Sequence, residues 1–154
     1  MKSPIKFMLR LAGDSTGSAL VEMTIVVPVA ISMMAGVVDF GMAFATQATG
    51  GKSLRDAGRY LSTLPLSAAC GWGVANAKNL AVYGNLAGTG SPLITGWATS
   101  NVTITTSPAN CATQPYTIIV TATIPYTSIM VASFLPISST FTLTAQHEEP
   151  SLGQ

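Results

Sequence analysis

The longest apolar stretch of the chain lies near its N-terminus. It runs without a charged residue from Met23 to Val38, and it extends from Ala19 to Ala45 with Glu22 and Asp39 as its only charges. A helix of about 27 residues is roughly 40 Å long, and the hydrocarbon core of a bilayer is about 30 Å thick. The pattern therefore predicts a membrane-spanning helix. Pro28 lies inside it, and lipid-embedded helices tolerate proline where neighbours satisfy the freed backbone groups.

A second helical pattern continues from Thr46 to Leu64. Apolar residues recur there at steps of three and four, the spacing of one helical face, at Leu54, Ala57, Leu61 and Leu64. Pro65 is expected to end the helix. Gly50-Gly51 weakens it and is a candidate flexible joint between the apolar anchor and the head.

The remainder of the chain changes to a period of two. A short helix is predicted over 74–83, followed by a loop rich in glycine over 84–92. Alternating apolar and threonine residues predict three strands, over 101–106, 116–124 and 137–145. Pro125 and Pro136 are expected to mark strand ends, and the polar segment from His147 to Gln154 reads as a frayed tail.

These elements define an α+β fold, in which a long N-terminal transmembrane helix precedes a small antiparallel β-sheet head. The predicted division is a basic leader over 1–17, a transmembrane and extended amphipathic helix over 18–63, an α+β head over 64–147 and a flexible tail over 148–154. With 154 residues, the chain has room for one modest domain and an anchor.

Composition narrows the class of protein. Charged residues make up only 8% of the chain, against about 25% in an average soluble protein, and none lies between Asn79 and Gln146. The net charge of +1 gives no basic face for nucleic acid. With 48% hydrophobic residues, the chain is also unlike disordered proteins, which combine low hydrophobicity with high charge.

The chain has two cysteines, Cys70 and Cys111. On an exported protein, an even count indicates one disulfide. It would close a loop of about 40 residues and stabilise the head by about 3–4 kcal/mol. In a cytosolic protein, the same residues would be two buried free thiols.

Three interpretations of the N-terminal segment remain open from the pattern alone. It is a cleaved secretory signal with a small-x-small site at Ala43-Phe44-Ala45 before Thr46, an uncut signal anchor, or a segment cut ahead of the apolar run so that the helix is retained. Against the secretory signal, Asp14 and Glu22 fall inside its basic region and Asp39 lies between the apolar run and the cut.

The third interpretation explains Glu22. A carboxylate in a membrane helix costs about 2.5–3.5 kcal/mol on insertion scales, and such residues are usually paired and functional. A cut between Gly17 and Ser18 would create an α-amine one helical turn before Glu22, which can neutralise that amine or the amine of a neighbouring subunit. The alternative is that Glu22 merely lies at the level of the lipid headgroups.

The residues at this point resemble a known family. The segment Gly17-Ser-Ala-Leu-Val-Glu22-Met-Thr-Ile-Val-Val-Pro28-Val is similar to the processing and anchor segment of TadE/TadF-like pseudopilins, minor components of the tight-adherence (Tad, Flp-type) pilus machinery. The stretches at 36–44 and 54–60 fit the same pattern. The sequence departs from that pattern at Met23, where an aromatic residue is common, at Asp39, where Glu is common, and at Met42, where a basic residue is common.

The resemblance implies a pilin-like architecture and cleavage after Gly17 by a prepilin peptidase. It also implies partners among other pilins and pseudopilins, the inner-membrane Tad assembly platform and membrane lipid, with Glu22 and Asp39 as candidate charge-pairing residues. The expected location is the bacterial inner membrane, with a single pass, a cytoplasmic N-terminus and a periplasmic head that enters a surface pilus or assists its assembly. The basic residues do not decide the orientation, because Lys2, Lys6 and Arg10 on one side balance Lys52, Arg55 and Arg59 on the other.

The sequence offers little chemistry for catalysis. Its single histidine, His147, stands beside Glu148 and Glu149 in the predicted tail, and no zinc-protease, CxxC or GxSxG motif is present. We therefore expect no enzyme activity, cofactor, metal, nucleic acid or small-molecule substrate. The alternative to an assembly subunit is an exported periplasmic or surface module that binds or adheres and is tethered by an ordinary signal anchor.

Overall fold

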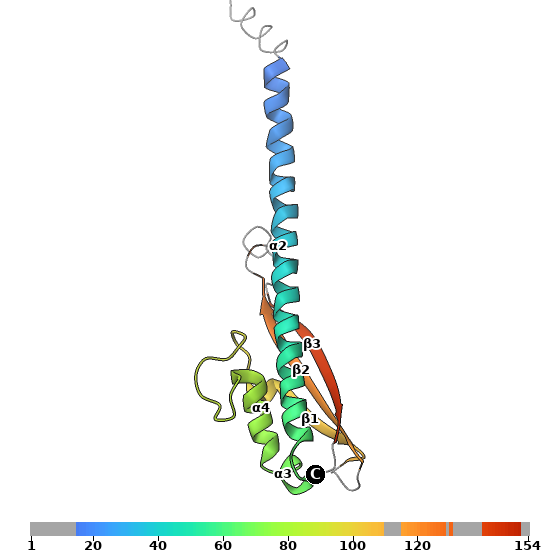
Figure 1. The fold of residues 1–154 in the computed structure, drawn as a ribbon. Helices are drawn as coiled ribbons and strands as arrows, with labels where there is room; N and C mark the ends of the chain where they lie inside the picture. Colours follow the sequence, from blue (N-terminus) through green and yellow to red (C-terminus); the bar gives the residue numbers. More distant parts are fainter. Residues whose placement is uncertain (1–14, 110–114, 129, 131–139, 152–154) are drawn as a thin grey trace, which may run out of the picture.

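The computed structural model describes residues 15–109, 115–128, 130 and 140–151. The element order is α2 (Ser15–Ser62), α3 (Leu66–Ala69), α4 (Gly73–Tyr83), a 3-10 turn η1 (Thr99–Asn101), β1 (Val102–Ser107), β2 (Thr117–Thr127) and β3 (Thr140–Pro150). Figure 1 shows α2 as a long rod whose N-terminal half stands clear, while all the other labelled elements gather around its C-terminal half. This is the α+β arrangement that the sequence predicted.

The helix α2 runs without interruption through Pro28. Its hydroxyl side chains bond to the backbone one turn earlier: Thr24 Oγ1 donates to the Leu20 carbonyl at 2.8 Å and Ser32 Oγ to the Pro28 carbonyl at 2.8 Å. Such bonds satisfy polar side chains inside the helix itself, which is what an apolar surrounding requires.

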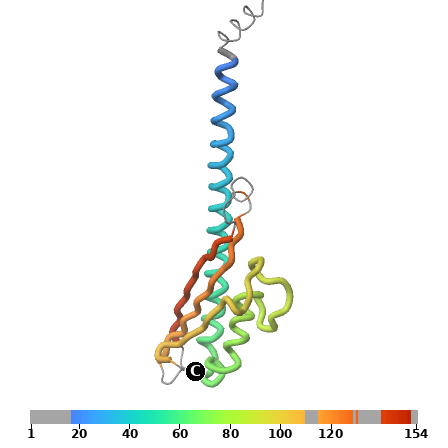
Figure 2. The backbone as a smooth tube through the Cα atoms, turned by 180° about the vertical axis from the view of Figure 1, so that it is seen from behind, coloured from blue at the N-terminus to red at the C-terminus, as the bar shows by residue number. Residues whose placement is uncertain are grey.

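The three strands form one antiparallel sheet in the order β1-β2-β3. β2 pairs with β1 only from Thr117 to Ala122, whereas it pairs with β3 along its full length, from Thr117 opposite Pro150 to Thr127 opposite Thr140. Viewed from behind, the sheet lies across the C-terminal half of α2 (Figure 2).

The core lies between α2 and the inner face of this sheet. Leu54, Ala57 and Leu61 of α2 are buried there, at the spacing that the sequence predicted for one helical face. The side chains that meet them come from alternate positions of β2, as the period of a strand requires: Ile118, Val120, Ala122 and Ile124. α4 adds Ala77, Ala81 and Val82 from beside α2.

The expected flexible joint at Gly50-Gly51 is wrong, because α2 is continuous across both residues and Gly50 is buried. A Cβ atom on Gly50 would collide with the Cδ1 atom of Ile124, whereas a Cβ on Gly51 would meet open space. Gly50 thus lets β2 approach the helix closely, which makes this position a packing contact.

Two strand ends also differ from expectation. β2 continues through Pro125, which was expected to end it; beyond Ala122 the strand has a partner on one side only, so the missing N–H of Pro125 can face the open side. β3 extends to Pro150, so the predicted tail is wrong for Glu148–Pro150. Pairing with β2 and a bond from the Ser151 N–H to the Tyr116 carbonyl at 2.9 Å hold this segment in the sheet.

Candidate assembly site: the apolar rod and the joint at Asp39

The N-terminal half of α2 presents apolar side chains on all sides, and apart from Ala35, which is buried, nearly all of them are exposed. Large apolar side chains are exposed from Leu20 to Val38, and they include Val21, Met23, Ile25, Val29, Ile31, Met34 and Val37. We call residues 17–38 the apolar rod. A helix that is hydrophobic all round belongs in a core or a membrane, and this one is long and apolar enough to cross a bilayer.

The rod ends at a carboxylate that is bonded to the head. Asp39 is only 6% exposed. Its Oδ2 accepts a hydrogen bond from Ser128 Oγ at 2.5 Å, and its Oδ1 accepts one from the Met130 backbone N–H at 3.2 Å. Asp39 therefore satisfies its charge with donors from the segment that follows β2, and it fixes that segment against the helix.

Tyr126 completes this joint. Its hydroxyl donates to the backbone carbonyl of Asp39 at 2.8 Å, an acceptor in the middle of α2 that can take a second bond. Burial, followed by the charge of Asp39 and a hydrogen bond with it, raises the pKa of the Tyr126 phenol above its usual 10.0. The phenol therefore stays neutral and keeps its donor. We call Asp39, Tyr126, Ser128 and Met130 the Asp39 joint.

The residues predicted for processing lie at the far end of the rod. Gly17, Ser18 and Glu22 all fall within α2, and all three residues are exposed. Even Glu22, the nearest of the three to the head, lies about 25 Å from Asp39 along the helix axis. Cleavage after Gly17 and charge pairing by Glu22 or Asp39 with other chains stay predictions.

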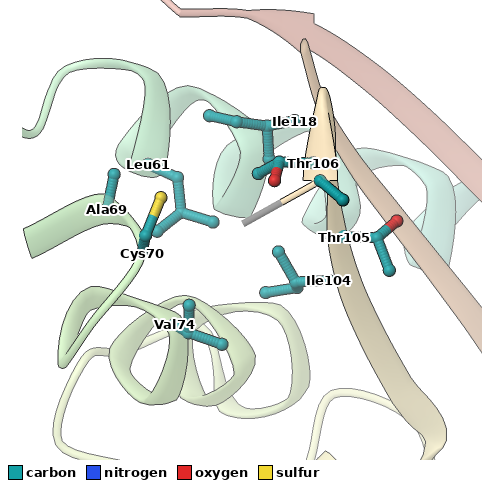
Figure 3. Close-up of a pocket in the computed structure, with 9 residues that line it drawn as sticks. Leu61, Ala69, Cys70, Val74, Ile104, Thr105, Thr106 and Ile118 are labelled. Carbon is teal, nitrogen blue, oxygen red and sulfur yellow. The ribbon is translucent and has the colours of Figure 1, made fainter. Parts of the chain in front are cut away.

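Of the two cysteines, Cys70 follows α3 at the distal end of the head and is not a free thiol. Cys111 lies outside the described residues, so the predicted pairing stays a prediction. Cys70 lines a shallow pocket of about 250 Å³ with Leu61, Val74 and Ile104 (Figure 3). The pocket lies between the end of α2, the start of α4 and β1, and its described lining is apolar except for two threonines, which gives it no group for acid–base chemistry.

His147, expected in a solvated tail, instead belongs to β3 and is half-buried. Its Nε2 lies 2.9 Å from Glu149 Oε2 on the same side of the strand, and its ring faces Gly58 of α2. In the described part of the chain, no three His, Cys, Asp or Glu side chains come together as metal ligands would.

These observations define a class: an α+β protein whose small sheet head is built onto the C-terminal half of one helix that can span a membrane. The TadE-like protein family model matches residues 17–59, which is the apolar rod and most of the helix under the head. This segment is thus TadE-like, which confirms the resemblance to TadE/TadF-like proteins of the Tad pilus. No curated protein and no solved structure matches the chain.

Sequence reasoning singled out Asp39 but missed its partners. Tyr126, Ser128 and Met130 lie 87, 89 and 91 residues farther along the chain, too far for a local pattern to connect them with Asp39. The sequence contains one indication of such partners, because a carboxylate at the end of an apolar stretch needs a hydrogen-bond donor if it is buried.

Proposed function

We propose that this chain is a membrane-anchored minor pseudopilin that assists or joins the assembly of a Tad (Flp-type) pilus. The observation that carries the proposal is a TadE-like helix whose first half is apolar on every side and whose second half is the backbone of the head. A helix of this kind offers lateral contacts to lipid or to other apolar helices and leaves the head outside the bilayer.

In this proposal a prepilin peptidase cuts between Gly17 and Ser18, and the helix stays attached. The Asp39 joint supports retention over the alternative of a secretory signal cut before Thr46. Such a cut would remove Asp39 and leave the donors of Tyr126, Ser128 and Met130 without their acceptor. The Ser128 hydroxyl is buried and the other two donors are part-buried, so each lost hydrogen bond would cost the head about 0.5–1.5 kcal/mol, against a total stability of only about 5–15 kcal/mol.

Glu22 would act after processing. The new amine of Ser18 and the carboxylate of Glu22 are four residues apart on the helix, so they can pair within one chain or across two neighbouring chains. Pairing with a neighbour's amine would set the axial register between subunits in the membrane, where an unpaired charge is costly.

The head would lie on the periplasmic side of the inner membrane. A cysteine pair and a head without Lys, Arg, Asp or Glu between Asn79 and Gln146 suit an oxidising compartment. The proposed partners are the peptidase, other pilins and pseudopilins, and the inner-membrane assembly platform. The second candidate, a binding module on an ordinary anchor, would use the same fold but would not need Glu22.

The test is a pair of variants expressed in a strain that lacks the native copy. Glu22→Ala should be cleaved normally and remain in the membrane, because the cut site and the apolar rod are unchanged, yet it should fail to restore piliation. Glu22→Asp, which keeps the charge, is the matched control and should restore it at least partly. Normal piliation with Glu22→Ala would refute the proposed role of this residue and favour the tethered binding module.

Processing is tested separately with glycine variants in the same helix. Gly17→Val should block cleavage because the residue ahead of the cut must be small. Gly36→Val is the control: a Cβ there meets nothing within 4 Å, as at Gly17, so its processing should be unchanged. Equal processing of both variants would contradict a cut after Gly17.

A further inference from the structure

The end of the head that faces the apolar rod is unusually apolar. Outside the rod, seven of the described large apolar side chains are exposed. Two of them are Trp72 and Leu86, and the other five lie at this end of the head. The five are between 41% and 73% exposed: Phe40, Phe44, Leu93, Met130 and Phe141. We call these five residues the apolar rim.

Contacts with the Asp39 joint bring the rim residues together from four separate segments. The backbone N–H of Met130 donates to Asp39, and Phe141 is the β3 partner of Tyr126. Leu93 lines a groove of about 490 Å³ together with Ala45 and Tyr126. Figure 1 shows the end of β2 and the start of β3 at the level where α2 emerges from the head.

We propose that the apolar rim rests on the surface of the lipid bilayer, so that the head is held against the membrane by a second contact besides the helix. This inference rests on the proposed membrane anchoring. The partner is the interfacial layer of the outer face of the membrane, into which apolar side chains of surface-bound elements reach about 5–10 Å.

The height of the rim along α2 carries the inference. From Ala19 to Asp39 the helix rises about 30 Å, which is the thickness of the hydrocarbon core. Phe40 and Phe44, four residues apart on one helical face, then fall at the interface between hydrocarbon and headgroups. Phenylalanine and leucine on the apolar face of surface-bound helices are buried at that level.

The charge distribution agrees with lipid contact. Asp39, beside Phe40, is already buried and bonded to the head. The next charged residues along α2, Lys52 and Arg55, lie at least eight residues beyond Phe44, or about 12 Å farther from the membrane. The described residues that line the groove are uncharged. Contact with the bilayer would therefore cover apolar surface without removing any charge from water.

The test measures depth with tryptophan reporters in the full chain, reconstituted into phosphatidylethanolamine–phosphatidylglycerol bilayers that contain brominated lipids as quenchers. Trp97 is buried and serves as a common background, and a Trp72→Phe background removes the exposed indole at the turn before α4. Into this background one places Phe141→Trp as the rim reporter and Ile31→Trp as the rod reporter. The chain with native Trp72 and no added tryptophan is the distal control.

We expect lipids brominated near the glycerol backbone to quench the emission of the Phe141→Trp variant and to shift its maximum to the blue. Lipids brominated deep in the acyl chain should quench the Ile31→Trp variant, and the Trp72 control should be unaffected. Circular dichroism verifies that both variants keep the native helix and sheet content.

Each other outcome is decisive. Quenching of Ile31→Trp without quenching of Phe141→Trp would overturn the rim contact and leave the membrane anchor standing. Absence of quenching for Ile31→Trp would refute the anchor itself. The Phe141→Trp variant is also measured in nanodiscs that hold one chain each. If its tryptophan is shielded from water in bilayers but not in these nanodiscs, a second protein copy and not lipid covers the rim, and the inference is overturned.

Discussion

At the scale of single residues, Asp39 explains how the apolar rod and the head are joined. A carboxylate at the end of an apolar helix would cost several kcal/mol if it were desolvated alone. Here its two oxygens accept bonds from Ser128 and the Met130 backbone, while its own carbonyl accepts from Tyr126. The residue that looks least suited to its surroundings is the one that orients the head on the rod.

Replacing Asp39 by Ala should destabilise the head by about 1–3 kcal/mol, because the buried Ser128 hydroxyl and the part-buried Met130 N–H lose their acceptor. The free energy of unfolding of the detergent-solubilised chain, measured with urea, checks this. Asp56→Ala is the matched control, since Asp56 is exposed on the same helix and its loss should be near neutral. Equal effects of the two variants would argue against the joint.

Tyr126 gives the joint a predictable pH dependence. Its pKa is raised in the folded state above 10.0, first by burial and then by Asp39, so its neutral form is favoured by folding. The stability that depends on the neutral phenol is complete below about pH 10 and is lost as pH rises through the folded-state pKa.

The difference in unfolding free energy between the native chain and Tyr126→Phe should therefore be constant from about pH 7 to pH 9 and shrink above about pH 10. Comparing the two proteins removes the contribution of the other tyrosines. A difference that already disappears below pH 9 would show that the phenol is not held neutral by this site.

At the scale of elements, the close contact between α2 and β2 depends on a glycine at one position of the helix surface. Gly50 lies under Ile124, which is fully buried, whereas the neighbouring Gly51 faces open space. Two adjacent glycines in one helix thus have opposite roles.

Gly51→Ala should raise the free energy of unfolding by up to about 1 kcal/mol, the gain in helix propensity over glycine. Gly50→Ala has the same propensity gain but overpacks the interface, at a cost of about 1–3 kcal/mol, so its net effect should be destabilising. Thermal unfolding of the two variants provides the comparison. If both alanines stabilise the chain, β2 does not pack on the helix at this point.

The local sequence pattern predicted those helices and strands whose conformation depends on their own residues. Helical spacing identified the buried face of α2 at Leu54, Ala57 and Leu61, and alternation found β1 to within a residue at each end. The pattern did not predict strand ends that depend on pairing with a distant segment of the chain. Pro125 was expected to end β2 because the sequence does not show that β1 stops at the residue opposite Ala122, and Glu148–Pro150 looked frayed because their charges conceal a pairing with β2.

At the scale of the whole molecule, the rod, the Asp39 joint and the sheet form one continuous unit around α2. The TadE-like match ends at residue 59, so it covers the rod and most of the packing face of α2 but none of the sheet. The candidate site was predictable only in its helical half; the residues that receive Asp39 come from the part that no resemblance describes.

Retention of the rod is the central claim, and the intact mass of the protein extracted from membranes of the producing cell tests it most directly. We predict a mass that corresponds to a chain beginning at Ser18, found in the membrane fraction. A mass that corresponds to a chain beginning at Thr46, found in the soluble fraction, would contradict the account, because such a protein would lack both the apolar rod and Asp39.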